Sequence, residues 1–267
     1  MLRSILLVLI LNCLATPGFS KERNFLNNIW VGEKLEYLEI RSDTLISEIH
    51  TFHVSMCRFK LMSDTLFISQ RDLRDTDAHI DEYVPRFIVQ KSDSLTLILK
   101  SVYAFDSIPV HCVPKSKLID RNFHFQKIQF TSSNCYGDCP AYKMSIDSVG
   151  QIYLEVGWSK WVKSGYYKSQ LSKKKLNELC TILKSSAVDR FPENRGQAID
   201  APSYSFVFYY NNKIKKSFGS KIPYFSRELL YYLILLPPKL RLKQTKERMV
   251  FERTTVDRFL FPPKLKH

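Results

Sequence analysis

The stretch Ser63-Asp64-Thr65-Leu66-Phe67-Ile68-Ser69 joins a turn to an extended apolar run, and this pattern organises the first half of the chain. The same Ser-Asp-[Thr/Ser]-Leu tetrapeptide recurs at residues 42–45 and 92–95. Ser and Asp side chains hydrogen-bond to their own backbone in turns, and short apolar runs flank all three tetrapeptides. Closely spaced strands of this kind favour an antiparallel β meander over residues 25–112, folded as a sandwich or a partial barrel. The six predicted strands lie at 35–40, 45–49, 54–61, 66–69, 86–90 and 95–99.

Trp30 stands just ahead of these strands, and the meander that follows it resembles the small lipocalin-like domains of exported bacterial proteins. The resemblance covers about residues 25–112 and implies an antiparallel barrel. Two features depart from that family: Asn28-Ile29-Trp30 lacks the usual Gly-x-Trp, and six strands are fewer than the usual eight. The sandwich and the partial barrel therefore remain alternatives.

The second half of the chain has a different periodicity. A linker is predicted at residues 113–124, where Pro114 and mixed charges separate two patterned regions. Asn211-Asn212 is a good two-residue hairpin turn. Apolar residues alternate along five extended runs, which predict strands at 127–130, 142–147, 152–156, 204–210 and 213–218.

Two helices complete this half. Ser172 is a good N-cap for a helix whose apolar residues recur at helical spacing, and a second helix at 226–236 ends at a double proline. The order β-β-β-α-β-β-α predicts an α+β domain over residues 125–236 in a chain that is mainly β. A basic tail rich in proline and aromatic residues follows at 237–267, and it either binds a partner or packs back on the protein. The helical apolar positions are Leu176, Leu179, Cys180 and Leu183.

One cysteine motif lies between the first two of these strands: Cys135-Tyr136-Gly137-Asp138-Cys139-Pro140-Ala141-Tyr142. The motif, together with the turn at Gly150, resembles the Cys-x-Gly-x-Cys-Pro-x-Tyr pattern of an uncharacterised bacterial domain family, domain of unknown function 6438. The resemblance covers about residues 125–236, where Gly165, Asp200-Ala201-Pro202 and Pro223 also match. It implies a fold and an exported protein, and it implies no reaction.

Cys135 and Cys139 are the candidate disulfide pair. In an oxidising compartment the bond is sterically possible, with Gly137 supplying the tight turn. A redox-active pair is the weaker alternative, because Pro140 leads into a strand and no helix N-terminus would stabilise a thiolate. A zinc site is weaker still, since two cysteines would need added histidines.

The first 20 residues have the order typical of a secretory signal peptide. Arg3 precedes the apolar run 5–11, and the small residues Gly18 and Ser20 stand before a predicted cut at Lys21. We therefore expect an exported protein that is periplasmic, outer-membrane-associated or secreted. After removal of the signal peptide, no transmembrane span is expected, because no other apolar run is long enough.

Basic residues are concentrated in the second half of the chain, and the formal net charge is +14. In an exported protein we expect the partner of such a surface to be an anionic lipid or an acidic glycan, and not nucleic acid. Two separate, solvated lysine clusters are the alternative to one cationic site. The candidate anion-binding residues are Lys173, Lys174, Lys175, Lys213, Lys215 and Lys216.

The usual catalytic signatures, such as Gly-x-Ser-x-Gly and His-Glu-x-x-His, do not occur in the sequence. The acidic cluster at 72–82 lacks the spacing of a calcium loop, so neither a metal nor a cofactor is expected. We expect a non-catalytic binding or structural module of the bacterial envelope. The alternative is a thiol-dependent or other enzyme centred on Cys135, Cys139 and Asp200. A binding module should contain one coherent cavity in the first half or a continuous cationic face in the second.

Overall fold

The computed structural model describes residues 25–49, 55–70, 73, 82–103, 108–135, 137–196 and 201–252. Contacts divide the chain into two compact units. The first comprises Met1–Gly32 with Leu38–Pro114, and the second comprises Glu33–Tyr37 with Lys115–His267. Apart from Glu33–Tyr37, which clusters with the second unit, the two units follow each other along the sequence.

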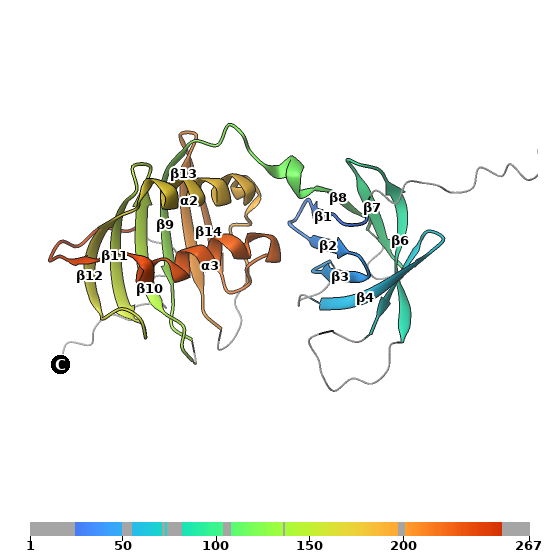
Figure 1. Ribbon diagram of the computed structural model, residues 1–267, viewed down its shortest axis with the longest axis horizontal. Coiled ribbons are helices and arrows are strands. Elements are labelled where there is room, and N and C mark those ends of the chain that lie inside the picture. Colours follow the sequence, from blue (N-terminus) through green and yellow to red (C-terminus); the bar gives the residue numbers. More distant parts are fainter. Residues whose placement is uncertain are drawn as a thin grey trace, which may run out of the picture. The chain divides into compact units, whose positions relative to one another are not determined.

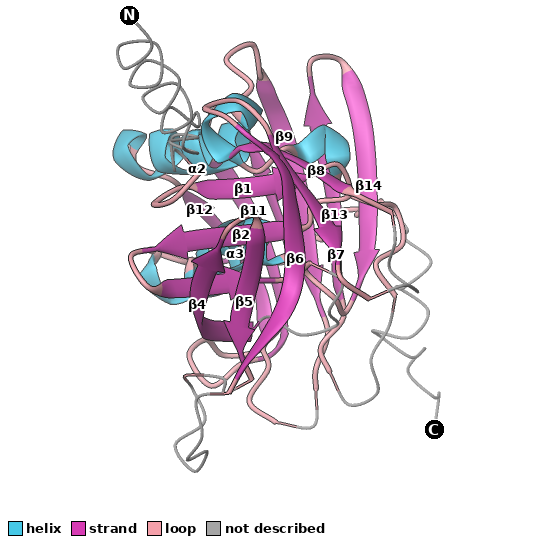
Figure 2. Cartoon of the chain, turned by 90° about the vertical axis from the view of Figure 1, so that its right-hand side faces the viewer, coloured by secondary structure: helices cyan, strands magenta, loops and turns pink. Residues whose placement is uncertain are grey.

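The first unit is a closed antiparallel barrel of eight strands (Figures 1 and 2). The prediction of an antiparallel β domain is confirmed, and pairing of β1 with β8 makes the barrel complete. Its apolar core includes Trp30, Leu38, Leu66 and Leu97, all fully buried. The strands are β1 (Ile29–Gly32), β2 (Tyr37–Arg41), β3 (Thr44–Ser47), β4 (Ser55–Met62), β5 (Thr65–Ser69), β6 (Tyr83–Ser92), β7 (Leu97–Ser101) and β8 (Val110–Pro114).

The three Ser-Asp turns connect β2 to β3, β4 to β5 and β6 to β7. In a meander of antiparallel strands, alternate connections lie at the same end, so all three turns close one end of the barrel. In the first two turns, Ser42 and Ser63 have φ values of 49° and 54°. In the third, the Asp93 carboxylate accepts hydrogen bonds from the backbone N–H groups of Leu95 (2.8 Å) and Thr96 (2.7 Å).

The second unit is built on an antiparallel sheet with the strand order β14-β13-β9-β10-β11-β12-β15 and two helices, α2 and α3 (Figure 1). The α+β prediction for this half is confirmed, and the structure adds β12 and β15 to the predicted strands. The elements are β9 (Phe125–Ser132), β10 (Ala141–Asp147), β11 (Gln151–Trp158), β12 (Gly165–Gln170), α2 (Lys173–Ser185), β13 (Tyr204–Tyr210), β14 (Lys213–Gly219), α3 (Arg227–Leu235) and β15 (Lys243–Gln244), with 3-10 turns at Lys115–Leu118, Val188–Arg190, Tyr224–Ser226 and Pro237–Lys239.

Both helices lie across one face of the sheet (Figure 1). Ser172 caps α2 as predicted, because its hydroxyl accepts a hydrogen bond from the backbone N–H of Lys175. The Tyr232 hydroxyl of α3 donates to the carbonyl of Lys175 (2.8 Å), which ties the two helices together. The apolar face of the sheet includes Phe206 and Phe208, whose rings stack 5.6 Å apart and each make a T-shaped contact with Phe191.

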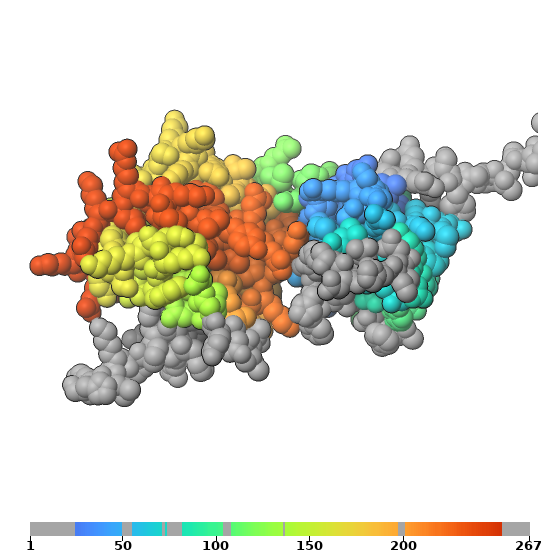
Figure 3. All heavy atoms as spheres, turned by 60° about the horizontal axis from the view of Figure 1, so that its bottom comes forward, coloured from blue at the N-terminus to red at the C-terminus, as the bar shows by residue number. Residues whose placement is uncertain are grey.

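The first part of the predicted tail packs back on the sheet. Lys243 pairs with Lys168 as β15 adds to β12. Red atoms of the C-terminal part lie beside yellow atoms of the sheet unit in Figure 3. Further along, the backbone N–H of Glu252 donates to the Gln129 side chain (3.0 Å), and the Glu252 carboxylate lies 2.6 Å from the Lys216 ammonium. Residues 253–267 lie outside the described part of the chain.

Candidate functional site

The barrel contains a cavity of about 500 Å³. Strands β3 to β6 line most of it, and the bordering residues Ile49, Ser55, Gln70 and Tyr103 lie at the barrel end opposite the three Ser-Asp turns. This volume lies in the range typical of small-molecule sites, about 300–1,000 Å³. The lining combines apolar side chains with hydroxyl, amide, thiol and guanidinium groups: Leu45, Ser47, Ile49, Ser55, Cys57, Ile68, Ser69, Gln70, Val84, Arg86, Phe87 and Tyr103.

None of these lining residues was singled out from the sequence. A sequence pattern could have placed them on one face, because alternate residues of a strand point to the same side. Leu45, Ser47 and Ile49 follow this spacing, and so do Ser55 and Cys57. Serine at inward positions is the unusual feature, because a packed barrel interior calls for larger apolar side chains. Small inward residues leave the space that larger ones would fill.

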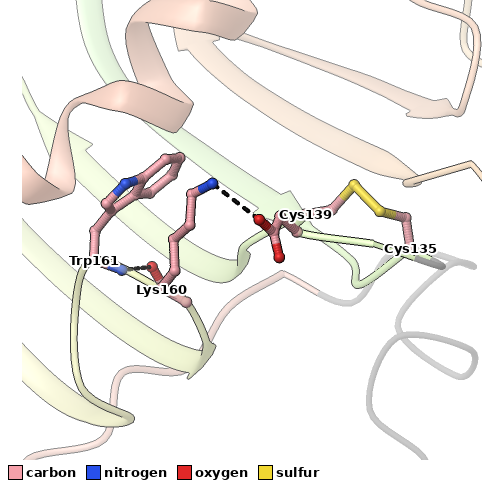
Figure 4. A network of polar contacts seen from close by, with 6 residues as sticks. Cys135, Cys139, Lys160 and Trp161 are labelled. Carbon is pink, nitrogen blue, oxygen red and sulfur yellow. Dashed lines mark hydrogen bonds and ion pairs between the residues drawn. A yellow bond between two sulfur atoms is a disulfide. The ribbon is translucent and has the colours of Figure 1, made fainter.

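The cysteine motif forms a loop between β9 and β10. The Cys135 and Cys139 sulfur atoms lie at disulfide distance, 2.00 Å, with their Cα atoms 5.4 Å apart (Figure 4). Gly137 does not adopt a positive φ, and a Cβ built on it would meet only the Cys135 sulfur at 3.8 Å. Gly137 lies in a bend of this loop, and this bend does not depend on the positive φ that favours glycine.

Polar contacts join this loop to the connection between β11 and β12 (Figure 4). The Asp138 carboxylate lies 3.0 Å from the Lys160 ammonium, which in turn lies 5.2 Å from the centre of the Trp161 ring. Nearby, the hydroxyls of Tyr142 and Ser159 are 2.8 Å apart, and burial raises the pKa of Tyr142. The exposed ion pair contributes little to stability. We interpret the disulfide loop as a brace between two strand connections.

The structure does not bring the six candidate lysines together. The first three open α2, directly after β12, whereas the others lie on β14, at the opposite side of a sheet in which roughly 24 Å separates the two strands. Lys215 and Lys216 are consecutive residues of β14 and pair with the consecutive residues Phe208 and Val207 of β13, so their side chains point to opposite faces of the sheet. The Lys175 ammonium donates to the Lys239 carbonyl (2.6 Å), and Lys216 pairs with Glu252. Because β12 and β14 lie farther apart than the Debye length of about 8 Å, we expect the two groups of lysines to act separately.

Two predicted features fall outside the described residues. Asp200 is one, and most of the acidic cluster at 72–82 is the other. Within the described residues, no group of three or more His, Cys, Asp or Glu side chains is arranged to hold a metal ion. The described helices are all too short or too polar to cross a membrane.

Arg195 is a buried cation that sequence reasoning missed. Its guanidinium donates to the Ser217 hydroxyl (2.9 Å) and to the carbonyls of Lys221 (3.0 Å) and Tyr204 (2.8 Å). Burial lowers the pKa of Arg195 to about 9. Because its three acceptors are neutral and belong to β13, β14 and the segment after β14, we interpret Arg195 as a structural tie.

Residues 126–228 match the family described as Domain of unknown function (DUF6438). The second unit therefore contains a DUF6438 domain, as the resemblance of its cysteine motif predicted, and the first unit is an eight-stranded antiparallel barrel. The family description indicates no activity. No curated protein matches the chain.

Proposed function

We propose that the chain is an exported, non-catalytic binding protein whose barrel cavity holds a small ligand with an apolar body. The cavity of about 500 Å³ is the observation that carries the proposal. Its walls provide apolar area for burial and a few polar groups for orientation, the combination typical of small-molecule sites. The sequence at residues 1–20 supports the proposed export.

The enzyme alternative receives less support. Both cysteine sulfurs lie at disulfide distance, and β10 follows them, so no helix dipole would stabilise a thiolate. Among the described residues that line the cavity, the polar ones include three serines but neither a carboxylate nor a histidine that could act as their general base. A non-catalytic role therefore fits the described cavity better.

The proposal is tested by titrating the full chain with the neutral fluorescent probe N-phenyl-1-naphthylamine. We expect one saturable site, lost in Ser55→Trp, whose indole would occupy the cavity. Met56→Trp is the matched control, because the next residue along β4 points away from the cavity and should keep the site. Equal binding by both variants would place the probe elsewhere and overturn the proposal.

Export is tested separately by fractionating the native host. We expect the protein in the periplasm, the outer membrane or the medium, with an N-terminus near Lys21 in mass spectrometry. A cytoplasmic protein with an intact Met1 would contradict the proposed address.

A further inference from the structure

A β-bulge in β6 changes which side chains enter the barrel cavity. Leu66 pairs with Phe87, but its neighbour Phe67 pairs with Pro85, so Arg86 is an extra residue opposite β5. In a regular strand, consecutive side chains point to opposite faces. Here both Arg86 and Phe87 line the cavity. Bulges commonly re-aim a side chain beside a functional site, and this one adds a guanidinium to the lining.

The guanidinium of Arg86 lies among aromatic rings of the cavity wall. Its Cζ atom is 5.2 Å from the centre of the Tyr103 ring and 6.0 Å from that of Phe87. Within the described residues, the Arg86 side chain forms no salt bridge. The backbone carbonyl of Arg86 accepts a hydrogen bond from the N–H of Val102, which leaves the guanidinium uninvolved. Ring faces stabilise the cation without using its planar fork of N–H donors. Those donors stay available to an incoming group.

We propose that Arg86 binds the anionic head of an amphipathic ligand whose apolar body fills the rest of the cavity; this rests on the proposed function. A carboxylate or related oxyanion can accept two parallel hydrogen bonds from a guanidinium and neutralise it in a partly dry site. The apolar wall, which includes Leu45, Ile49 and Ile68, provides the burial that a small inorganic anion could not use. The expected ligand class is therefore a single-chain carboxylate amphiphile.

The test compares cis-parinaric acid with its methyl ester, which keeps the polyene body and removes the charge. With the full chain, we expect the acid to bind at least about tenfold more tightly than the ester. Arg86→Gln should weaken the acid by about the same factor and leave the ester unchanged, whereas Arg86→Lys should fall between them. Arg58→Gln is the matched control, because Arg58 is exposed on β4 two strands away. It should leave both affinities unchanged.

Four other outcomes would overturn the inference or the proposed function. Ester binding reports that the barrel of each variant is folded, so a loss of both probes in Arg86→Gln and Arg86→Lys would make Arg86 structural and overturn the inference. Equal affinity of the unaltered chain for acid and ester would refute the anionic head while leaving the proposed cavity intact. Failure of both probes to bind would refute the proposed function itself. Displacement of the acid by sodium phosphate at matched ionic strength would reassign the site to a free anion and also overturn the inference.

Discussion

Gly219, the last residue of β14, shows how one residue can be fixed by its neighbours. It has a φ of +135°, and a Cβ built on it would lie 2.5 Å from the Gly196 carbonyl oxygen. We predict that Gly219→Ala lowers the free energy of unfolding of the second unit by about 3 kcal/mol, from backbone strain and steric overlap. Gly137→Ala is the control and should change it by less than about 0.5 kcal/mol. Hydrogen exchange read by mass spectrometry resolves the two units, and equal effects of both variants would contradict this account.

The partly buried side chain of Tyr204 should make the stability of the second unit depend on pH above neutrality. Burial raises its pKa to about 12 from the ordinary value of 10.0. The unfolded chain therefore loses this proton at a lower pH than the folded chain, so the stabilisation is present below pH 10 and is lost as pH rises toward 12. We expect Tyr204→Phe to flatten the decline of urea-unfolding stability between pH 9.5 and 11.5, a window around the ordinary pKa of tyrosine. An unchanged decline in that variant would show that another group controls it.

At the same scale, the sequence identified reactive residue types better than cavity residues. Cys135 and Cys139 stand in a short, recognisable motif, and local chain geometry alone allows them to meet. Arg86 stands in a sequence without such a motif, and its orientation depends on a bulge set by pairing between β5 and β6. The six lysines illustrate the opposite problem, because their proximity depends on strand order, which local sequence patterns do not determine.

The hairpin turns provide a matched test at the scale of elements. Ser63 has a positive φ, which is energetically unfavourable for serine. Ser92 is the first residue of the corresponding tetrapeptide in the third turn, and its φ is not positive. We predict that Ser63→Gly raises barrel stability by about 0.5 kcal/mol because it relieves this strain. Ser92→Gly should lower it by a similar amount because glycine loses more entropy on folding. Urea unfolding of the two variants checks the opposite signs, and two changes in the same direction would be inconsistent with these turn geometries.

The disulfide loop is the second element with a measurable contribution. The bond links residues four apart, so the loop it closes in the unfolded chain is short. We predict that Cys135→Ser with Cys139→Ser lowers the free energy of unfolding by about 2 kcal/mol. Non-reducing peptide mapping of the unaltered protein should recover the two cysteines as one linked species. Recovery of two unmodified thiols would contradict the brace.

Element types were predictable where periodicity is strong, and four strands were missed where it is weak: β1, β8, β12 and the two-residue β15. β1 and β8 are short, and Pro114 with nearby charges resembles a linker, although proline is tolerated at a strand end. In β12 every residue but the last is half-buried, so the apolar and polar positions do not alternate. Closure of the barrel depends on β1 pairing with β8, a contact between segments about 80 residues apart that no local pattern reports.

For the whole molecule, a barrel with a cavity accompanies a DUF6438 domain in one chain. The described part of the DUF6438 unit has its polar sheet face partly covered by the chain's own segment around Glu252 and its apolar face covered by two helices. The described cavity of about 500 Å³ lies in the barrel. We therefore assign the proposed binding role to the barrel, which makes ligand contact there the central claim.

Methyl NMR spectra during titration of the full chain with cis-parinaric acid test this claim most directly. We predict saturable shifts for methyl groups of the cavity wall, those of Leu45, Ile49, Ile68 and Val84. The sheet methyls of Ile152 and Leu154, in the core of the other unit, serve as an internal reference and should stay in place. Shifts confined to the sheet unit, or the absence of saturable shifts in the cavity wall, would contradict the account.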